Sequence, residues 1–125
     1  MLTIRKEQLR VFDQDRRSRF LALMLAHLRK FFPARCESLG ERGLREWIEH
    51  GTKRAATYHV VSERDVCKYI DIMLVFGKDF DQDARFPWAA RLLKIPRTKP
   101  GEKMNLLFEA AKEHQAQLTA EAPRG

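Results

Sequence analysis

The segment DFDQD at 79–83 carries an aspartate at every second position, which is the spacing that opens an EF-hand calcium loop. Such a loop also needs a glycine at its sixth position and a bidentate glutamate at its twelfth. Counted from Asp79, those positions hold Ala84 and Ala90, and Pro87 falls inside the loop. We therefore predict that the segment binds no calcium. Its carboxylates are expected to hydrogen-bond local amides and to precede a helix start, where acids are favoured.

The histidines and cysteines form no pattern typical of a metal site or a nucleophile. The chain has no close cysteine pair and no His-x-x-x-His spacing, which a structural zinc site would require. Cys67 lies near His59 and Asp71, but a helix would stack Cys67 and Asp71 beside its inward residues, which predicts a buried, unreactive thiol. The glycine segments GERG and GEK match no nucleotide-binding fingerprint. We predict no catalytic residue, no metal and no cofactor.

The formal net charge of +7 is concentrated near the N-terminus. The basic residues there are Arg5, Lys6, Arg10, Arg16, Arg17, Arg19, Arg29 and Lys30. A basic field attracts polyanions, so nucleic-acid binding is one hypothesis. The basic residues spread around the helix, however, and three acids, Glu7, Asp13 and Asp15, lie among them. A solvated surface, or one that faces an acidic protein, explains this mixture at least as well as nucleic acid does. For an acidic protein partner, the candidate contacts are Arg5, Arg10, Arg16 and Arg17.

The tripeptide FPW at 86–88 places two aromatic residues around a proline close to a loop. If Trp88 is exposed, it is a candidate anchor for a partner protein. If it is buried, it fills one end of a helical core, as tryptophan commonly does. Phe86 and Trp88 therefore join the candidate partner contacts, with the core as the alternative.

Apolar residues at helical spacing run through most of the chain and predict an all-α fold. The expected helices cover about 4–32, 44–58, 62–76, 87–94 and a last segment that begins after Gly101. Pro33 is expected to end the first helix, SERD at 62–65 to cap the third and Gly77 to end it. The predicted core includes Met24, Leu28, Phe31, Tyr69, Ile70 and Met73. We expect a compact bundle of about four to five helices with a long N-terminal helix.

The length of 125 residues suits one domain, which we place at 1–118, followed by a flexible tail at 119–125. Two cysteines make no disulfide framework, so a reducing compartment is expected. The stretch DRRSRFLALMLAHLRKFFPA at 15–34 invites interpretation as a twin-arginine signal, but its apolar run is short, contains His27 and lacks a cleavage site. It is also far short of the ~20 apolar residues that span a membrane. We predict a cytoplasmic protein with no membrane segment.

Several segments together resemble a family of small bacterial proteins encoded near type VI secretion spike and effector genes. These segments are RKEQ at 5–8, AHLRKFFP at 26–33, ERDVCKYIDIML at 63–74, GKDFDQD at 77–83 and PWA at 87–89. The resemblance covers most of 4–93 and brings no active-site residue with it. It implies a cytoplasmic accessory protein that binds an effector or a spike component, as an adaptor, a chaperone or an immunity protein. Two hypotheses follow: a non-enzymatic protein-binding module, or a nucleic-acid-binding regulator that uses the basic N-terminal helix.

Overall fold

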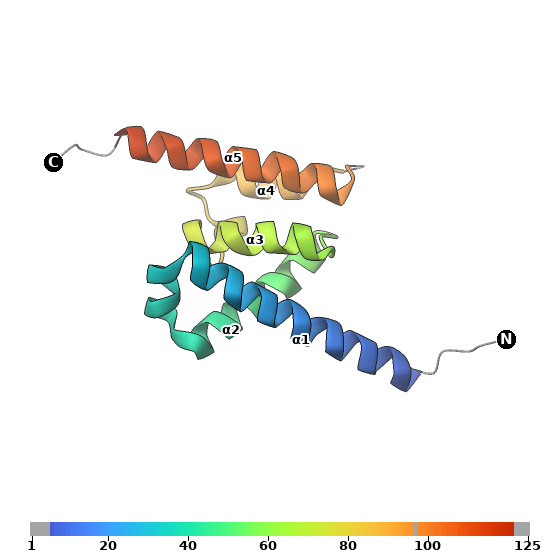
Figure 1. The fold of residues 1–125 in the computed structure, drawn as a ribbon. Helices are drawn as coiled ribbons and strands as arrows, with labels where there is room; N and C mark the ends of the chain where they lie inside the picture. The colour runs from blue at the N-terminus through green and yellow to red at the C-terminus, as the bar shows by residue number, and fades with distance from the viewer. Residues whose placement is uncertain (1–5, 97, 122–125) are drawn as a thin grey trace. The chain divides into compact units, whose positions relative to one another are not determined.

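The structure is a computed structural model that describes the backbone of residues 6–96 and 98–121, and the side chains of 14–96, 98–99 and 101–118. These residues form helices and no strand, which confirms the all-α prediction (Figure 1). The elements are α1 (Lys6–Phe31), α2 (Pro33–Thr57), α3 (Glu63–Phe76), the 3-10 turn η1 (Phe80–Gln82), α4 (Pro87–Leu93) and α5 (Pro100–Glu121). No helix among the described residues is both long and apolar enough to cross a membrane.

The backbone groups into two compact units, Met1–Ile48 and Glu49–Gly125, and the boundary falls within α2. The first unit holds α1 and the first half of α2, and the second holds the remaining elements. The single domain that we expected over 1–118 stays a prediction. The flexible tail that we expected over 119–125 also stays a prediction. The helix α5 runs to Glu121, and residues 122–125 lie outside the described part.

In the first unit, α2 begins at Pro33, well before the start near residue 44 that we predicted, so that prediction was wrong. Proline ends α1 as expected, but it also suits the first turn of a helix. A backbone N–H in that turn has no acceptor within the helix, so its absence in proline costs no hydrogen bond. The two halves of α2 meet at a kink at Gly40, whose φ of 72° is a backbone conformation that glycine adopts without penalty. The sequence between Pro33 and Gly40 is therefore helical and not a connector.

The predicted core residues of α1 are only partly confirmed. Met24 and Leu28 are buried, but the Phe31 side chain is 58% exposed, so its placement in the core was wrong. Phe31 is the last residue of α1, and no further turn of the same helix follows to cover its ring. The ring lies against His27, with 4.9 Å between the ring centroids.

In the second unit, α3 begins as the sequence predicts. The Ser62 hydroxyl accepts a hydrogen bond from the backbone N–H of Asp65 at 3.2 Å, and Gly77 follows the last turn. The predicted core residues Tyr69, Ile70 and Met73 are all buried.

The helices α2 and α3 approach closely at Gly51, which has no side chain to separate them. A Cβ atom at this position would lie 2.6 Å from the Met73 sulfur and 2.8 Å from Ile70 Cγ1. Because interiors are packed at crystal-like density, there is no room for that carbon. The glycine is therefore needed for the contact between the two helices.

The end of α2 is closed by a Schellman motif, the hydrogen-bonded cap in which one residue adopts a left-handed conformation. His59 takes that position with φ 64°, and the Val60 N–H donates to the Ala55 carbonyl at 3.0 Å. The helix α5, which packs along α3 and α4, adds a further cap (Figure 1). Its buried Lys103 donates from Nζ to the Tyr58 carbonyl at 3.1 Å.

Candidate functional site

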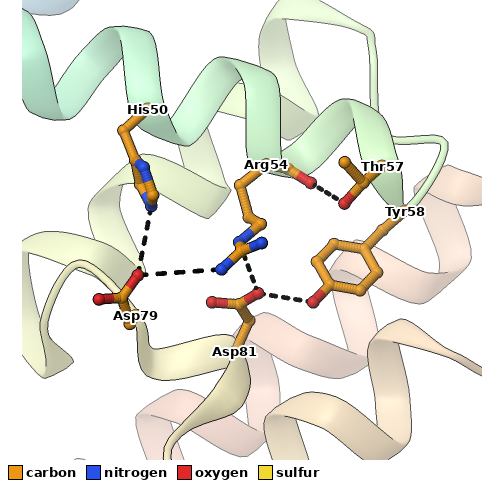
Figure 2. Close-up of polar contacts among 6 residues, drawn as sticks. All are labelled: His50, Arg54, Thr57, Tyr58, Asp79 and Asp81. Carbon is orange, nitrogen blue, oxygen red and sulfur yellow. Dashed lines mark hydrogen bonds and ion pairs between the residues drawn. The ribbon is translucent and has the colours of Figure 1, made fainter.

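The DFDQD segment forms the turn between α3 and α4, and Phe80 holds it against the helices. The Phe80 side chain is buried, and its ring centroid lies 5.0 Å from that of Tyr69 on α3. With Phe80 turned inward, the 3-10 turn η1 places the Asp81 side chain against the helix α2 (Figure 2). Asp79 and Asp81 both lie near Arg54, whereas Asp83 pairs with Arg85.

Asp81 is the centre of a buried polar network, although sequence analysis had assigned it only local hydrogen bonds. Its side chain is fully buried, and one carboxylate oxygen, Oδ2, lies 3.0 Å from Arg54 Nε. The Tyr58 hydroxyl donates to the same oxygen at 2.6 Å (Figure 2). A buried carboxylate is tolerated only when it is paired and hydrogen-bonded, and Arg54 and Tyr58 supply both.

The other two aspartates have different partners. Asp79 Oδ1 lies 3.5 Å from His50 Nε2 and 3.9 Å from an Arg54 nitrogen. Asp83 accepts a hydrogen bond from the backbone N–H of Arg85 at 2.9 Å and pairs with its guanidinium at 2.7 Å. The hydrogen bonds from Arg85 lower the pKa of the exposed Asp83 carboxyl.

A calcium loop would require these carboxylates to converge on one ion, with oxygen ligands all around it. Instead Asp81 points to Arg54 and Tyr58, and Asp79 points to His50 (Figure 2). Asp83 pairs with Arg85. The guanidinium of Arg54, close to two of the three aspartates, would also repel a cation. The absence of calcium binding stays a prediction, and the side-chain directions now give it a physical reason. The expectation of purely local hydrogen bonds holds for Asp83 but is wrong for Asp81.

The residues of α2 that complete this network were missed by sequence analysis. His50, Arg54 and Tyr58 follow one another at intervals of four residues, so they lie on one face of the helix. This face is also close to Gly51 and Ala55, both of which are buried against the rest of the unit. This row of polar residues lies beside small buried residues of the same helix. In the sequence, that arrangement could have indicated that the polar side chains pair with another residue inside the fold.

The two tyrosines of this region hold their protons, and Tyr58 uses its proton to donate a hydrogen bond to Asp81. Burial, followed by the hydrogen bond to Asp81, raises the pKa of Tyr58. Burial, followed by the charge of Asp81, raises the pKa of Tyr69, whose hydroxyl forms no hydrogen bond within the described residues. Neither phenol is suited to act as a general base near neutral pH.

The thiols are likewise held in their unreactive form. Burial, with a smaller contribution from Asp71, raises the pKa of Cys67 from 9.0 to about 11. Burial also raises the pKa of Cys36. Because a nucleophilic cysteine needs a lowered pKa, these surroundings favour inert thiols. Cys67 is half-buried, so the prediction of full burial was wrong, while its predicted unreactivity is supported.

The FPW residues lie in an aromatic cluster of the second unit. Phe86 is buried, and its ring centroid lies 4.9 Å from that of Phe76 and 5.3 Å from that of His114. Trp88 is half-buried, and its indole N–H donates to His114 Nδ1 at 3.3 Å. The core alternative therefore applies to Phe86, which is only 7% exposed. Trp88 keeps only part of its ring accessible, and its polar edge is already bonded.

The basic candidates of α1 have the opposite surroundings. Residues 14–19 are all exposed, and Arg16, Arg17 and Arg19 form no ion pair with any described residue. Arg5 and the side chain of Arg10 lie outside the described residues. The structure thus leaves Arg16 and Arg17 exposed on α1, and their role as partner contacts stays a prediction.

A hollow of about 350 Å³ lies at the kink of α2 in the first unit. It is lined by Arg29, Pro33, Cys36, Glu37, Gly40, Glu41 and Leu44. Arg29 and Glu41 face each other at 3.5 Å and offset each other's charge, which leaves Glu37 as the other charged residue of the lining. No convergent set of unpaired polar groups marks it as a ligand site.

Comparison with protein-family models, with curated proteins and with solved structures gives no match for this chain.

Proposed function

We propose that this protein is a non-enzymatic binding module that docks through the exposed arginines of α1 on an acidic surface of another protein. The observation that carries the proposal is the contrast in charge pairing. Glu46, Asp81 and Asp83 pair with arginines, whereas Arg16, Arg17 and Arg19 are exposed and form no ion pair with any residue that the structure describes. Unpaired charges at a surface steer a partner of opposite charge and fix its orientation.

The state of the reactive groups supports a role without catalysis. The thiols and phenols are held protonated, and the carboxylates of DFDQD are paired with arginine or histidine. A catalytic centre would need at least one group whose pKa is adjusted towards neutral pH beside a cleft. The protonation states and ion pairs of these groups therefore favour a binding surface over an enzyme active site.

A more specific role follows from the resemblance to small proteins encoded near type VI secretion genes. We propose a cytoplasmic adaptor, chaperone or immunity protein whose partner is an acidic effector or spike component. Many such roles need only a stable helical module with one recognition surface, which this chain offers. The alternative, a nucleic-acid-binding regulator, would use the same arginines, and Asp15 beside them weakens it.

Affinity capture from the native host tests the proposal. The intact chain is compared with the triple variant R16E/R17E/R19E, and captured proteins are identified by mass spectrometry. We expect an acidic protein that the wild type retains and the variant loses. Fluorescence anisotropy with random DNA and RNA tests the alternative, for which non-specific binding should stay near ~10⁻⁴ M at physiological salt. Sub-micromolar binding that the triple variant loses would favour the nucleic-acid function instead.

A further inference from the structure

The helix α1 carries large apolar side chains on two of its sides. One side holds the buried residues Met24, Leu25 and Leu28. Another holds Leu23 and Phe31, whose side chains are 63% and 58% exposed. Two such side chains on one short segment are more than a scattered surface residue, because each leaves apolar area in water.

These exposed residues belong to a regular stripe. Phe20, Leu23, His27 and Phe31 follow at intervals of three, four and four residues, which places them on one face of the helix. Phe20 and His27 are half-buried, and the His27 ring supports the exposed Phe31 ring at 4.9 Å. Spacings of this kind are those by which one helix seats in a groove or against another helix.

Basic residues border the same stripe. Arg16, Arg19 and Lys30 are exposed on this side of α1, and Lys30 Nζ lies 5.3 Å from the centre of the Phe31 ring. Between residues 16 and 31 the sequence contains no acidic residue. The surface is thus apolar along its middle and positive along its border. Residues 16–31 contain no acidic side chain that would offset the positive charge.

We propose that this outer face of α1, formed by Arg16, Arg19, Phe20, Leu23, Lys30 and Phe31, binds an acidic amphipathic helix of a partner protein. The partner would place leucine-like side chains against Leu23 and Phe31 and carboxylates opposite the bordering arginines and lysine. This inference rests on the proposed function and specifies the chemistry of its partner. Desolvated apolar anchors supply most of the affinity of such contacts, and the border charges supply orientation.

Two other occupants fit the face less well. A second copy of the chain would bring arginine and lysine of one α1 against the same residues of the other, and like charges oppose such pairing. An anionic membrane would match the charge, but only two large apolar side chains are mostly exposed here, which is little area to insert into lipid. Charge complementarity and apolar spacing together favour the acidic helix.

Synthetic helical peptides of three identical heptads provide defined probes. One peptide has leucine at the first and fourth heptad positions, glutamate at the fifth and seventh, and glutamine elsewhere. The second has lysine in place of glutamate, and the third has alanine in place of leucine. Binding of each labelled peptide to the full chain is measured by fluorescence anisotropy, beside vesicles of phosphatidylcholine with about 30% phosphatidylglycerol, a content chosen to mimic an anionic membrane.

We expect the glutamate–leucine peptide to bind at least about tenfold more tightly than either of the other two peptides, a difference of 1.4 kcal/mol or more. The double variant L23S/F31S should weaken that binding by about tenfold or more, since both anchors are lost. The matched control V61S/L106S removes two exposed apolar side chains from the second unit and should change the affinity by less than about twofold. Circular dichroism of each variant verifies that the helices are retained.

Equal binding of the lysine peptide, equal loss in both double variants, stronger attachment to the vesicles or no peptide binding would each overturn the inference. These outcomes are separate from failure of the proposed function. If affinity capture gives an arginine-dependent partner while L23S/F31S still binds it, only the assignment of the outer face is wrong. If no arginine-dependent partner exists, the proposed function itself fails.

Discussion

Two charge-rich regions of this chain look alike in composition but use their charges differently. In the second unit, Asp81 is buried between Arg54 and Tyr58, so its charge serves the fold. In the first, Arg16 and Arg17 are exposed and form no ion pair with a residue that the structure describes. Exposed charges of one sign are solvated in the free protein and can attract a partner of opposite charge. Pairing inside the fold identifies Asp81 as a structural charge, whereas exposed arginines such as Arg16 and Arg17 are available for binding.

The largest effect is expected from Asp81→Ala. Removing the carboxylate leaves Arg54 without its closest acid and the Tyr58 hydroxyl without its acceptor, and breaking such a buried pair costs about 3 kcal/mol. Urea denaturation measures the free energy of unfolding. The exposed neighbour variant Asp79→Ala is the control and should cost at most about 1 kcal/mol. Equal, small losses at both positions would mean that Asp81 does not hold the turn.

Gly51→Ala should lower the free energy of unfolding by about 1 to 3 kcal/mol, because the added carbon overlaps Met73 and Ile70. The matched control is Gly43→Ala in the same helix, where the nearest atom would be 3.5 Å away. There the better helix propensity of alanine should stabilise the protein by up to about 1 kcal/mol. A stabilising Gly51→Ala would show that the α2–α3 contact is looser than the structure has it.

His59→Gly should stabilise the second unit by about 1 kcal/mol. His59 is exposed and has a positive φ, a conformation that costs a residue with a Cβ about 1 to 2 kcal/mol and costs glycine little. His59→Ala keeps the Cβ and should give no gain, which separates backbone strain from loss of the imidazole. Thermal unfolding of both variants provides the comparison, and destabilisation by glycine would argue against the Schellman cap.

The smallest effect, close to zero, is expected from calcium. A ligand at a hundred times its dissociation constant would add about 2.7 kcal/mol to stability, so binding would be visible as a raised unfolding midpoint. We expect the same midpoint in millimolar calcium and in chelator, because the DFDQD carboxylates already have protein partners. A rise of several degrees in the unfolding midpoint would contradict the assignment of these carboxylates as structural charges, since they would then bind calcium.

Local patterns predicted the helices of the second unit well. The cap at Ser62, the end of α3 at Gly77 and the buried face of Tyr69, Ile70 and Met73 all follow from short-range spacing. Pro33 was harder to interpret, because proline both ends helices and begins them, and only the backbone distinguishes these roles.

The polar network shows where sequence analysis stopped. Arg54 and Asp81 are far apart in the chain, and no local rule pairs a helix arginine with one of three similar aspartates. The even spacing does not distinguish the three aspartates, and the buried Phe80 and the 3-10 turn place Asp81 inside the fold. The exposed arginines Arg16 and Arg17 were predictable, because the polar run around them offers nothing to bury.

The affinity of the captured, purified partner for three forms of the full chain tests most directly whether the arginines of α1 form the binding surface. These are the wild type, R16E/R17E/R19E, and the matched reversal R64E/R91E/K94E, which makes the same change in net charge at exposed positions of the second unit. Isothermal titration should show an affinity at least about tenfold weaker for the α1 variant and within about twofold of wild type for the matched one. Equal losses in both variants, or none in the first, would contradict the claim that the unpaired arginines of α1 form the binding surface.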